Sequence, residues 1–578
     1  MLLRFAIAAP LALVLAAPGP QGAPPPPAAL TSDAIAVQLL AFNDFHGHLE
    51  PPTGSNGRIG SIDAGGVEYL ATHLRTLEAR NPNTLIVAAG DVIGATPLLS
   101  ALFHDEPTIE AMNAAGLDVA SVGNHEFDGG WAELYRMQHG GCHPVDGCQD
   151  HTPFAGASFQ YLSANVFLDP GKADRTLLAR TGIKLPDKRS RPLLPAYTIK
   201  DVGGVNIGFI GMTLKGTPQL VQPTGVIGLT FRSEADTVNK LIPVLKRQHV
   251  RAIVVLVHEG GFPVDGQFNG CPGISGAIVE IAKRIKDDVD VIVSGHTHQA
   301  YNCRLGKKLV TSAASFGRLI TAIELNIDKA TDEIVSKSAQ NVIVTRDVPR
   351  SAAHTAILDR YRPLYEPLAN RTIGTIARDI TRAQNAAGES ALGDVTADAQ
   401  LQAARDAATG GAVIALMNTG GIRADLTRRP SLDPQAPSPV SYADAFTVHP
   451  FQNRLIVKTF TGDQIRKVLE QQFDNRATGT DMMLQVSDGF TYSYDRSRPP
   501  GSRIDPMSIM LGGQRVGRQQ KYRVAITDFL SDGGDNFTVF TRGTEPIYAG
   551  LDIDALASYL QSHSPAVPGP MNRITRIK

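Results

Sequence analysis

The 578-residue sequence lacks a long apolar run beyond its first residues, and it also lacks an excess of charge of either sign. After residue 17 no segment is long and apolar enough to span a membrane, and the C-terminal NRITRIK carries no lipid-anchor signal. The formal net charge of −1 gives no basis for general electrostatic attraction to nucleic acid or anionic membrane. We find no internal repeat and no low-complexity run after Pro27.

The N-terminus has the pattern of a secretory signal peptide. Arg4 precedes the apolar stretch Phe5–Ala17, and small residues and a Pro-rich segment follow up to residue 27. The alternative is an uncleaved membrane anchor, but about 13 apolar residues are short for a span. No cysteine follows the stretch, which argues against a lipoprotein. We therefore predict a signal peptide and Pro-rich segment over 1–27, and a secreted, periplasmic or cell-surface protein.

Cysteine is scarce, but its count is even. The chain has four: Cys142, Cys148, Cys271 and Cys303. An even number in an exported chain favours disulfides, and we predict the pairs 142–148 and 271–303. A zinc site built with His139, His143 and His151 is the alternative, although HPVDG lacks the spacing of a zinc knuckle.

The length and the pattern of apolar residues predict two α/β units. Over 36–345 short apolar runs typical of buried strands alternate with helical stretches. The strands are expected at Ala36–Phe42, Thr84–Ala89, Val119–Val122, Val205–Ile210, Ala252–Val257, Val289–Val293 and Leu309–Ser312. Residues 130–160 are predicted to form a surface loop. A helix over 351–369 is expected to join this unit to a second one over 372–578.

Five segments of the first unit end in residues that bind metals. They are LLAFNDFHGH with Asp44 and His46, LIVAAGDVIG with Asp91, VASVGNHEFD with Asn124 and His125, IVVLVHEGG with His258, and VDVIVSGHTHQ with His296 and His298. Imidazole nitrogen and carboxylate oxygen suit zinc-class and manganese-class ions. Ligands in α/β sheets bind beyond the carboxyl ends of strands. A short turn must follow the first strand if Asp44 and His46 are to face one ion.

These motifs in this order resemble the calcineurin-type metallophosphoesterases, and in form they are similar to the 5′-nucleotidase family across essentially the whole mature chain. The resemblance implies an N-terminal four-layer α/β/β/α sandwich, a linker helix and a C-terminal α/β substrate-binding domain. It also implies two divalent metal ions, zinc, manganese or similar. Asp44, His46, Asp91 and His298 would hold one ion, and Asp91, Asn124, His258 and His296 the other.

The same resemblance gives His125 and Asp128 a catalytic role rather than a ligand role. The pair would stabilise charge on the transferring phosphoryl group or assist the leaving oxygen. His48 and Glu259 are interpreted as neighbours that shape the site.

The second unit carries further motifs that resemble the family. NTGGIRADL places Asn418 and Arg423 on a Gly-rich turn, where a guanidinium suits bidentate phosphate binding. HPFQN supplies Phe451 and Asn453, and DFLSDGGDNF supplies Phe529 and Asp535. By resemblance, the two phenylalanines sandwich a nucleobase and the aspartate binds the ribose hydroxyls.

One segment departs from the family pattern. Relatives carry a second phosphate-binding arginine a few residues before the glutamate of RAQNAAGESALGD, whereas Ala386 and other small residues stand there in this chain. Arg382, further upstream, is the candidate substitute.

The sequence therefore predicts an exported two-metal phosphohydrolase that converts nucleoside 5′-monophosphates to nucleoside and phosphate. Its partner would be a small nucleotide, with no nucleic acid bound and no stable membrane insertion, and the linker helix would act as a hinge. UDP-sugars or 2′,3′-cyclic nucleotides are alternative substrates of the same site. A catalytically silent nucleotide-binding or adhesion protein is the alternative of a different class.

Overall fold

The computed structural model describes residues 34–578 except 170, 182–188, 430, 432, 434 and 475–480. The predicted signal peptide and Pro-rich segment lie outside the described residues. Within the described part of the chain, no helix combines the length and apolarity that crossing a bilayer requires.

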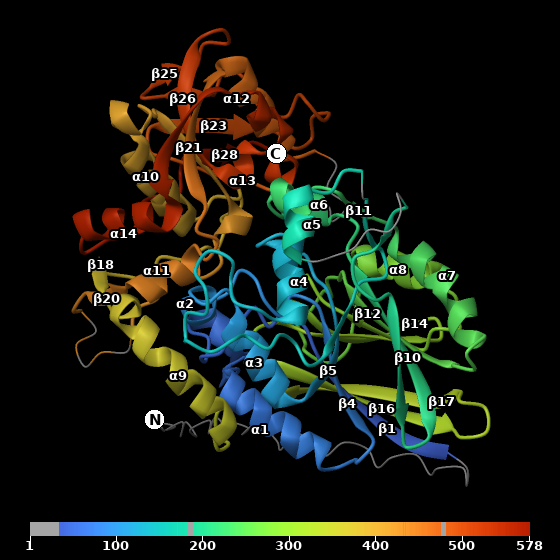
Figure 1. Cartoon of the computed structure of the whole chain (residues 1–578). Helices are drawn as coiled ribbons and strands as arrows, with labels where there is room; N and C mark the ends of the chain where they lie inside the picture. Colours follow the sequence, from blue (N-terminus) through green and yellow to red (C-terminus); the bar gives the residue numbers. More distant parts are fainter. Residues whose placement is uncertain are drawn as a thin grey trace, which may run out of the picture.

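Two six-stranded sheets lie face to face in the N-terminal half (Figure 1). The first has the order β17-β16-β1-β4-β5-β6 and the second β14-β15-β13-β12-β10-β9. The first sheet consists of β1 (Ala34–Phe42), β4 (Thr84–Ala89), β5 (Leu117–Ser121), β6 (Gln160–Leu162), β16 (Leu319–Asp328) and β17 (Ile334–Ile343). The second consists of β9 (Tyr197–Val202), β10 (Val205–Thr213), β12 (Ala252–His258), β13 (Val291–Ser294), β14 (Ala300–Leu305) and β15 (Lys308–Ala313).

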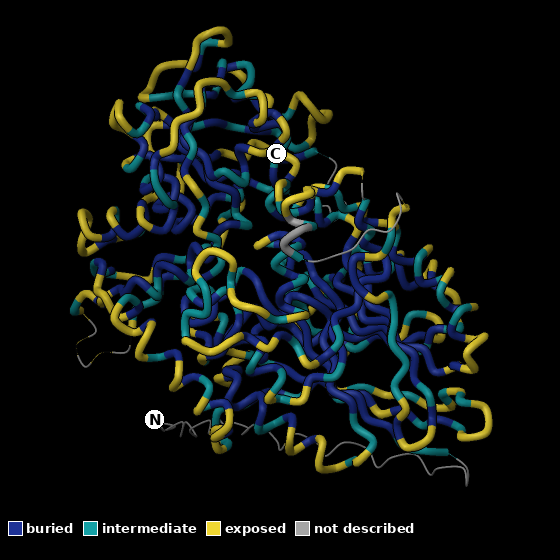
Figure 2. Tube along the Cα trace, in the orientation of Figure 1, coloured by how far each residue is buried: buried dark blue, intermediate teal, exposed yellow. Residues whose placement is uncertain are grey.

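Successive side chains along each strand point to opposite faces of its sheet, and this alternation defines the layers of the sandwich. In β1, Val37 and Leu39 pack between the sheets against Phe209 of β10, whereas Leu40 and Phe42 belong to the core beneath the helices. Those helices are α1 (Val67–Glu78) and α3 (Glu106–Ala115) on the first sheet, and α7 (Glu234–Lys246) and α8 (Ala277–Arg284) on the second. Each fully buried aliphatic or aromatic side chain contributes about 1.5–3 kcal/mol. The result is the predicted α/β/β/α sandwich, whose sheets are the buried centre seen in Figure 2.

The central strands of each sheet run parallel, so their carboxyl ends lie at the same edge. β1, β4 and β5 run parallel in the first sheet, and β10, β12, β13 and β15 run parallel in the second. Their carboxyl ends therefore meet at one edge of the sandwich, as expected for a ligand site of an α/β protein.

The prediction of a surface loop over 130–160 is wrong in its first third. Residues Trp131–His139 form helix α4, and Trp131, Leu134 and Met137 are buried. Their spacing of three places them along one face of a helix. The glycines that flank the helix, which are turn signals in the sequence, mark its two ends.

Helix α9 (Ala352–Ala369) connects the sandwich to the C-terminal sheets and runs along the flank of the N-terminal half in Figure 1. His354 Nε2 lies 3.0 Å from the Ala111 carbonyl of α3, and Tyr361 shares a core with Phe446 of α11 (Tyr442–Val448). The helix is thus packed against elements from both halves.

The C-terminal half is built around a five-stranded sheet of order β22-β19-β26-β21-β27. These strands are β22 (Leu484–Val486), β19 (Ile414–Asn418), β26 (Lys521–Thr527), β21 (Arg454–Thr461) and β27 (Thr544–Leu551). Helices α10 (Ala391–Ala404), α12 (Gly462–Gln471) and α14 (Asp552–Ser562) pack on it. The turns after β19 and β26 face the strand ends of the sandwich across a cleft.

Candidate functional site

The polar residues at the strand ends converge into two groups. Ligand atoms of Asp44, His46 and His298 lie within 4.8 Å of one another, and those of Asp91, His258 and His296 do the same. Asp44, His46, Asp91 and His258 are each at most 1% exposed. Polar residues of this kind are buried together because they lie at the ends of parallel strands that meet at one edge.

Asp91 lies between the two groups. Its Oδ2 is 2.9 Å from His258 Nε2 and 3.7 Å from His46 Nε2. Asp44 Oδ1 is 3.3 Å from His298 Nε2. This arrangement places one carboxylate where it can bridge two ions.

The remaining donor atoms fit divalent metal. The Nδ1 atoms of His46 and His258 each lie 2.8 Å from a backbone carbonyl, of Gly94 and Ala89, which directs both Nε2 lone pairs inward. Asn124 Oδ1 is buried and makes no hydrogen bond, and His258 Nε2 is buried with the Asp91 carboxylate 2.9 Å away. A buried polar atom without a partner is costly, and a metal ion would satisfy Asn124 Oδ1 and accept the Nε2 lone pair of His258.

The backbone at these residues is strained. Asp44, His46, Asp91, His296 and His298 all have φ between 49° and 71°, a region uncommon for non-glycine residues that costs about 1–3 kcal/mol each. The turn required after β1 is thus made by Asp44 and His46 themselves. Such strain persists only where surrounding structure imposes it, which marks this edge as functional.

The pKa shifts of the histidines do not follow their expected roles alone. Burial acts to lower the pKa of His258, a ligand candidate, but the Asp91 carboxylate outweighs burial and raises that pKa to about 10. Burial lowers the pKa of His46 and of His298 below the ordinary value, which favours the neutral form that binds metal. Burial opposes ionisation of His125 as well, but the carboxylates of Asp128 and Asp91 outweigh it and raise the pKa of His125.

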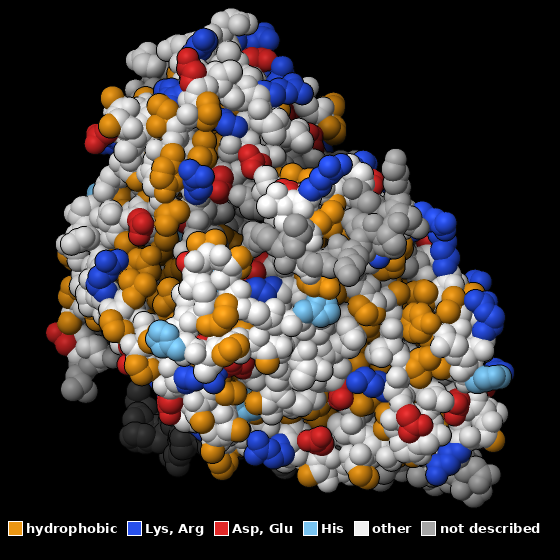
Figure 3. Space-filling model, in the orientation of Figure 1, with side chains coloured by type: hydrophobic (Ala, Val, Ile, Leu, Met, Phe, Trp, Pro, Cys, Tyr) orange, Lys and Arg blue, Asp and Glu red, His pale blue; other side chains and the backbone are white. Residues whose placement is uncertain are grey.

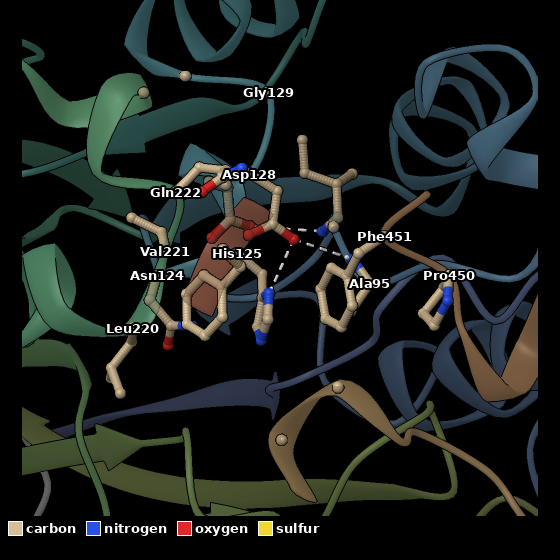
Figure 4. A pocket seen from close by; sticks show the side chains of 18 of the residues that line it. Ala95, Asn124, His125, Asp128, Gly129, Leu220, Val221, Gln222, Pro450 and Phe451 are labelled. Atoms are coloured by element: carbon tan, nitrogen blue, oxygen red, sulfur yellow. Dashed lines mark hydrogen bonds and ion pairs between the residues drawn. The ribbon is translucent and has the colours of Figure 1, made fainter. Parts of the chain in front are cut away.

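His125 and Asp128 form a hydrogen-bonded pair at the cavity wall. His125 Nδ1 is 2.8 Å from Asp128 Oδ2, and the same oxygen accepts the Ala95 N–H at 3.2 Å. Figure 4 shows this pair with the Phe451 ring beside it. The contact fixes the imidazole so that Nε2 is left for a ligand.

Glu126 is a residue of this site to which the sequence motifs gave no role. Its buried carboxylate accepts N–H groups from Asp91 at 2.9 Å, Val92 at 2.7 Å and Gly123 at 2.5 Å. It therefore ties the turn after β4 to the turn after β5. The acidic residue that directly follows His125 in the motif GNHEF was the available signal.

The substrate-binding residues predicted in the C-terminal half mostly face the same cleft. A cavity of about 1170 Å³ is lined by Asn124, His125 and His296 from one side. Asn418, Arg423, Phe451, Asn453, Phe529 and Asp535 line it from the other. The segment Leu220–Gln222, which the sequence did not point to, also contributes to the wall.

Contacts cross this cleft directly. The Phe451 ring stacks on His125 with centroids 5.7 Å apart and 23° between planes, and the Arg423 guanidinium lies 5.9 Å from the Phe451 centroid. Burial and the charge of Arg382 lower the pKa of Arg423, whereas Asp91 acts in the opposite direction. The pKa of Arg423 is therefore influenced by carboxylates of the N-terminal half.

The other C-terminal residues have defined partners. Asn418 Nδ2 donates to Asp535 Oδ2 at 2.8 Å, and Asn453 Nδ2 donates to Asp552 at 3.0 Å. Arg382 is not among the described residues that line the cavity. Its Nη2 donates to Asn56 of the sandwich at 2.9 Å.

His48 and Glu259 neighbour the metal-site candidates. The His48 ring lies against Phe316, with centroids 4.0 Å apart and 31° between the ring planes. Glu259 lines the cavity, where burial raises its pKa to about 7.

All four cysteines are paired as predicted, Cys142 with Cys148 and Cys271 with Cys303. Thiolates are thus not available for the alternative zinc site with His139, His143 and His151.

Comparison with known proteins gives matches across both halves. Residues 37–300 match the calcineurin-like phosphoesterase family, and residues 371–542 match the 5′-nucleotidase C-terminal domain. A cell wall protein of Listeria monocytogenes is 31% identical over 562 residues, covering 93% of this chain and 68% of its own length. The endonuclease YhcR of Bacillus subtilis is also 31% identical and covers 91% of this chain, but the chain spans only 40% of that protein.

The fold matches solved structures over the same extent. The 5′-nucleotidase precursor from Thermus thermophilus superposes with a TM-score of 0.75 at 25% identity, covering 94% of this chain and 100% of the other. With both sequence matches and this architecture, the chain belongs to the 5′-nucleotidase family, in which a calcineurin-like phosphoesterase domain is followed by a C-terminal 5′-nucleotidase domain.

Proposed function

We propose that this protein hydrolyses the phosphoester of nucleoside 5′-monophosphates, using two divalent metal ions. The observation that carries the proposal is the shared cavity, in which the strand-end residues face Arg423, Phe529 and Asp535. When the phosphate of a nucleotide lies at Asn124 and His125, its ribose and base can still contact the turns of the C-terminal half.

Two sets of donors would hold the ions. Asp44, His46, His298 and Asp91 would hold one, and Asp91, Asn124, His258 and His296 would hold the other. When bound, divalent ions polarise a phosphoester and lower the pKa of a water.

The protein's own residues supply the rest of the chemistry. Arg423 binds the phosphate oxygens through its guanidinium. Phe451 and Phe529 stack on the base, and Asp535, held by Asn418, accepts the ribose hydroxyls. His125, oriented by Asp128, donates a hydrogen bond to the oxygen that leaves.

The stacking role is tested by comparing two substrates. Phe529→Ala should lower kcat/KM for AMP about 5- to 150-fold, because stacking contributes about 1–3 kcal/mol per base, while a small aryl phosphate should be hydrolysed almost as before. Phe529→Tyr keeps the ring and serves as the matched control. Equal losses on both substrates would refute the role.

The metal requirement is tested separately. Chelation should abolish hydrolysis of both substrates, and zinc or manganese should restore it. His298→Ala should remove most turnover without changing the circular dichroism spectrum. Full activity in metal-free protein would exclude the proposal.

Cleavage of nucleic acid is the second candidate, because a relative covering most of this chain is named an endonuclease. Against it, positive and negative side chains are interspersed on the face shown in Figure 3 and do not form a basic track. A panel of AMP, UMP, ATP, UDP-glucose, 2′,3′-cyclic nucleotides and single-stranded oligonucleotides separates these substrates. Oligonucleotide cleavage faster than AMP hydrolysis would favour the nuclease.

We also propose that the protein acts outside the cytoplasm. The support is the N-terminal apolar segment of the sequence together with two disulfides, which persist in oxidising compartments. Cell fractionation with thiol alkylation tests this: export predicts no reactive thiol and loss of the first residues.

A further inference from the structure

A second cluster of metal-binding side chains lies outside the proposed dinuclear centre. His104 Nε2 is 2.7 Å and His143 Nδ1 is 3.3 Å from the same atom, Asp146 Oδ2. The two imidazoles are stacked, with centroids 3.6 Å apart and 15° between planes. Ligand atoms of all three residues lie within 4.8 Å of one another.

One side of the cluster is anchored to the sandwich. His104 stands between α2 (Leu98–Ala101) and α3 with φ 53°. The next residue, Asp105, accepts the Ser100 hydroxyl at 2.7 Å and the Gly94 N–H at 3.3 Å. The His104 backbone is therefore positioned by the turn that also orients His46.

On the other side of the cluster, the Cys142–Cys148 disulfide closes the chain into a small ring. His143 and Asp146 both lie inside the six-residue separation bridged by Cys142 and Cys148. Within this ring, His143 and Gly147 exchange backbone hydrogen bonds at 3.2 and 2.9 Å. The disulfide and these bonds hold two donors in place without an ion, which reduces the entropy lost on binding.

We propose that His104, His143 and Asp146 form a separate site for a zinc-class divalent ion. Two imidazole nitrogens and one carboxylate oxygen are the donors that zinc, copper and nickel prefer. Zinc–nitrogen distances of about 2.0–2.1 Å place neighbouring tetrahedral donors about 3.3 Å apart, so the two nitrogen–oxygen separations need only small adjustments. The stacked imidazoles would have to rotate apart so that both lone pairs point at one ion. The three side chains are 27%, 17% and 46% exposed, which leaves an entry path and room for water.

The competing interpretation is that His104, His143 and Asp146 only form hydrogen bonds, which hold the loop against the α2–α3 turn without an ion. We call this arrangement a hydrogen-bonded latch. In this structure Asp146 N–H donates to His143 Nδ1 at 3.2 Å, so the Nδ1 lone pair is directed at the Asp146 backbone. An ion would take over this lone pair, and the long hydrogen bond of an exposed loop costs little to give up, because water can replace it. The latch and the ion site differ in whether metal is retained.

The position of the site gives it access to the catalytic cleft. His104 and His143 line the same cavity as Asn124 and His125. An ion here would add positive charge to this part of the cavity wall, which Asp105 and Glu133 also line. It would also clamp the loop after α4 onto the α2–α3 turn, two segments that lie close together in Figure 1.

The test is a zinc count on the full-length, oxidised protein. Protein equilibrated with Zn²⁺ and passed through a desalting column is analysed by mass spectrometry of the metal. His143→Ala and Asp146→Asn should each hold one equivalent less than the wild type. His139→Ala, at the end of α4, and His151→Ala, in the loop that follows, lie outside the cluster and should hold as much as the wild type.

The difference of one equivalent does not depend on how the dinuclear centre fills, so it is independent of the proposed phosphohydrolase activity. A Co²⁺ titration gives a second readout, in which the wild type minus His143→Ala difference spectrum should contain the d–d bands of a histidine-bound ion. Equal zinc content in wild type and both cluster variants, or a featureless difference spectrum, would overturn the site and leave the latch.

Discussion

Asp128 Oδ2 accepts two hydrogen bonds at once, from His125 Nδ1 at 2.8 Å and from the Ala95 N–H at 3.2 Å. The carboxylate therefore connects the imidazole at the cavity wall to the turn that follows β4. Through this contact, Asp128 orients His125 without needing to touch the substrate.

Asp128→Asn should lower kcat about 10- to 100-fold. Asparagine can still accept the Ala95 N–H, but it lacks the charge that favours the hydrogen-bonding form of His125. Because Asp128 acts through His125, the double variant with His125→Ala should be no slower than His125→Ala alone. Steady-state kinetics on AMP check this, and additive losses would show that Asp128 has an independent role.

Glu126→Gln should weaken metal binding by about 10- to 100-fold, as is common for residues that support ligands from behind. The amide group would face backbone N–H donors of Val92 or Gly123 that now bind a carboxylate oxygen. Isothermal titration with Zn²⁺ measures the change, with the exposed Glu280→Gln as control. Unchanged affinity would mean that the two turns hold their shape without Glu126.

Much of this site could be predicted because its residues follow fully buried strands. The apolar run Thr84–Ala89 coincides with β4, and the motif residues stand directly after such runs. Strands with a partly exposed face gave a weaker signal: β16 and β17 alternate buried with more exposed residues and were not predicted. Helix α4 was missed because flanking glycines and nearby cysteines are typical of loops.

Contacts between distant segments could not be predicted from patterns. Nothing in the sequence indicates that Phe451 stacks on His125 or that Arg382 binds Asn56, because both depend on how the two halves pack together. His104 likewise stands alone in the sequence, 39 residues before His143, and only the fold brings it to Asp146.

Gly123→Ala should destabilise the protein by about 1–3 kcal/mol, the usual cost of overpacking, and should reduce metal binding. A Cβ at this position would lie against Asp91 Oδ1 and 2.6 Å from Asp91 N, so the Asp91 carboxylate would have to move. Thermal unfolding and zinc content report both effects. Gly569→Ala, where a Cβ would meet no atom within 4 Å, is the control; equal behaviour of the two variants would contradict the crowding.

Asp552→Asn should change how stability depends on pH. Burial raises the pKa of Asp552 from 3.8 to about 7, against the hydrogen bonds from Asn453 and Ile553 that lower it. A raised carboxyl pKa means that the folded state binds the proton more tightly, so stability from this group is full below pH 4 and falls until about pH 7. The difference between the two pKa values corresponds to at most about 4 kcal/mol.

Asparagine at position 552 does not titrate, so the variant should gain stability relative to the wild type as pH rises from 4 to 7. Calorimetric unfolding of both proteins at pH 4, 5.5 and 7.5 measures the difference in their free energies of unfolding. The other carboxylates contribute equally to both proteins, so their effects cancel in this difference. Asp554→Asn, exposed on the same helix α14, should show no such trend. A constant difference between wild type and Asp552→Asn across the range would mean that Asp552 stays ionised, with Asn453 and the Ile553 N–H sufficient to hold its charge.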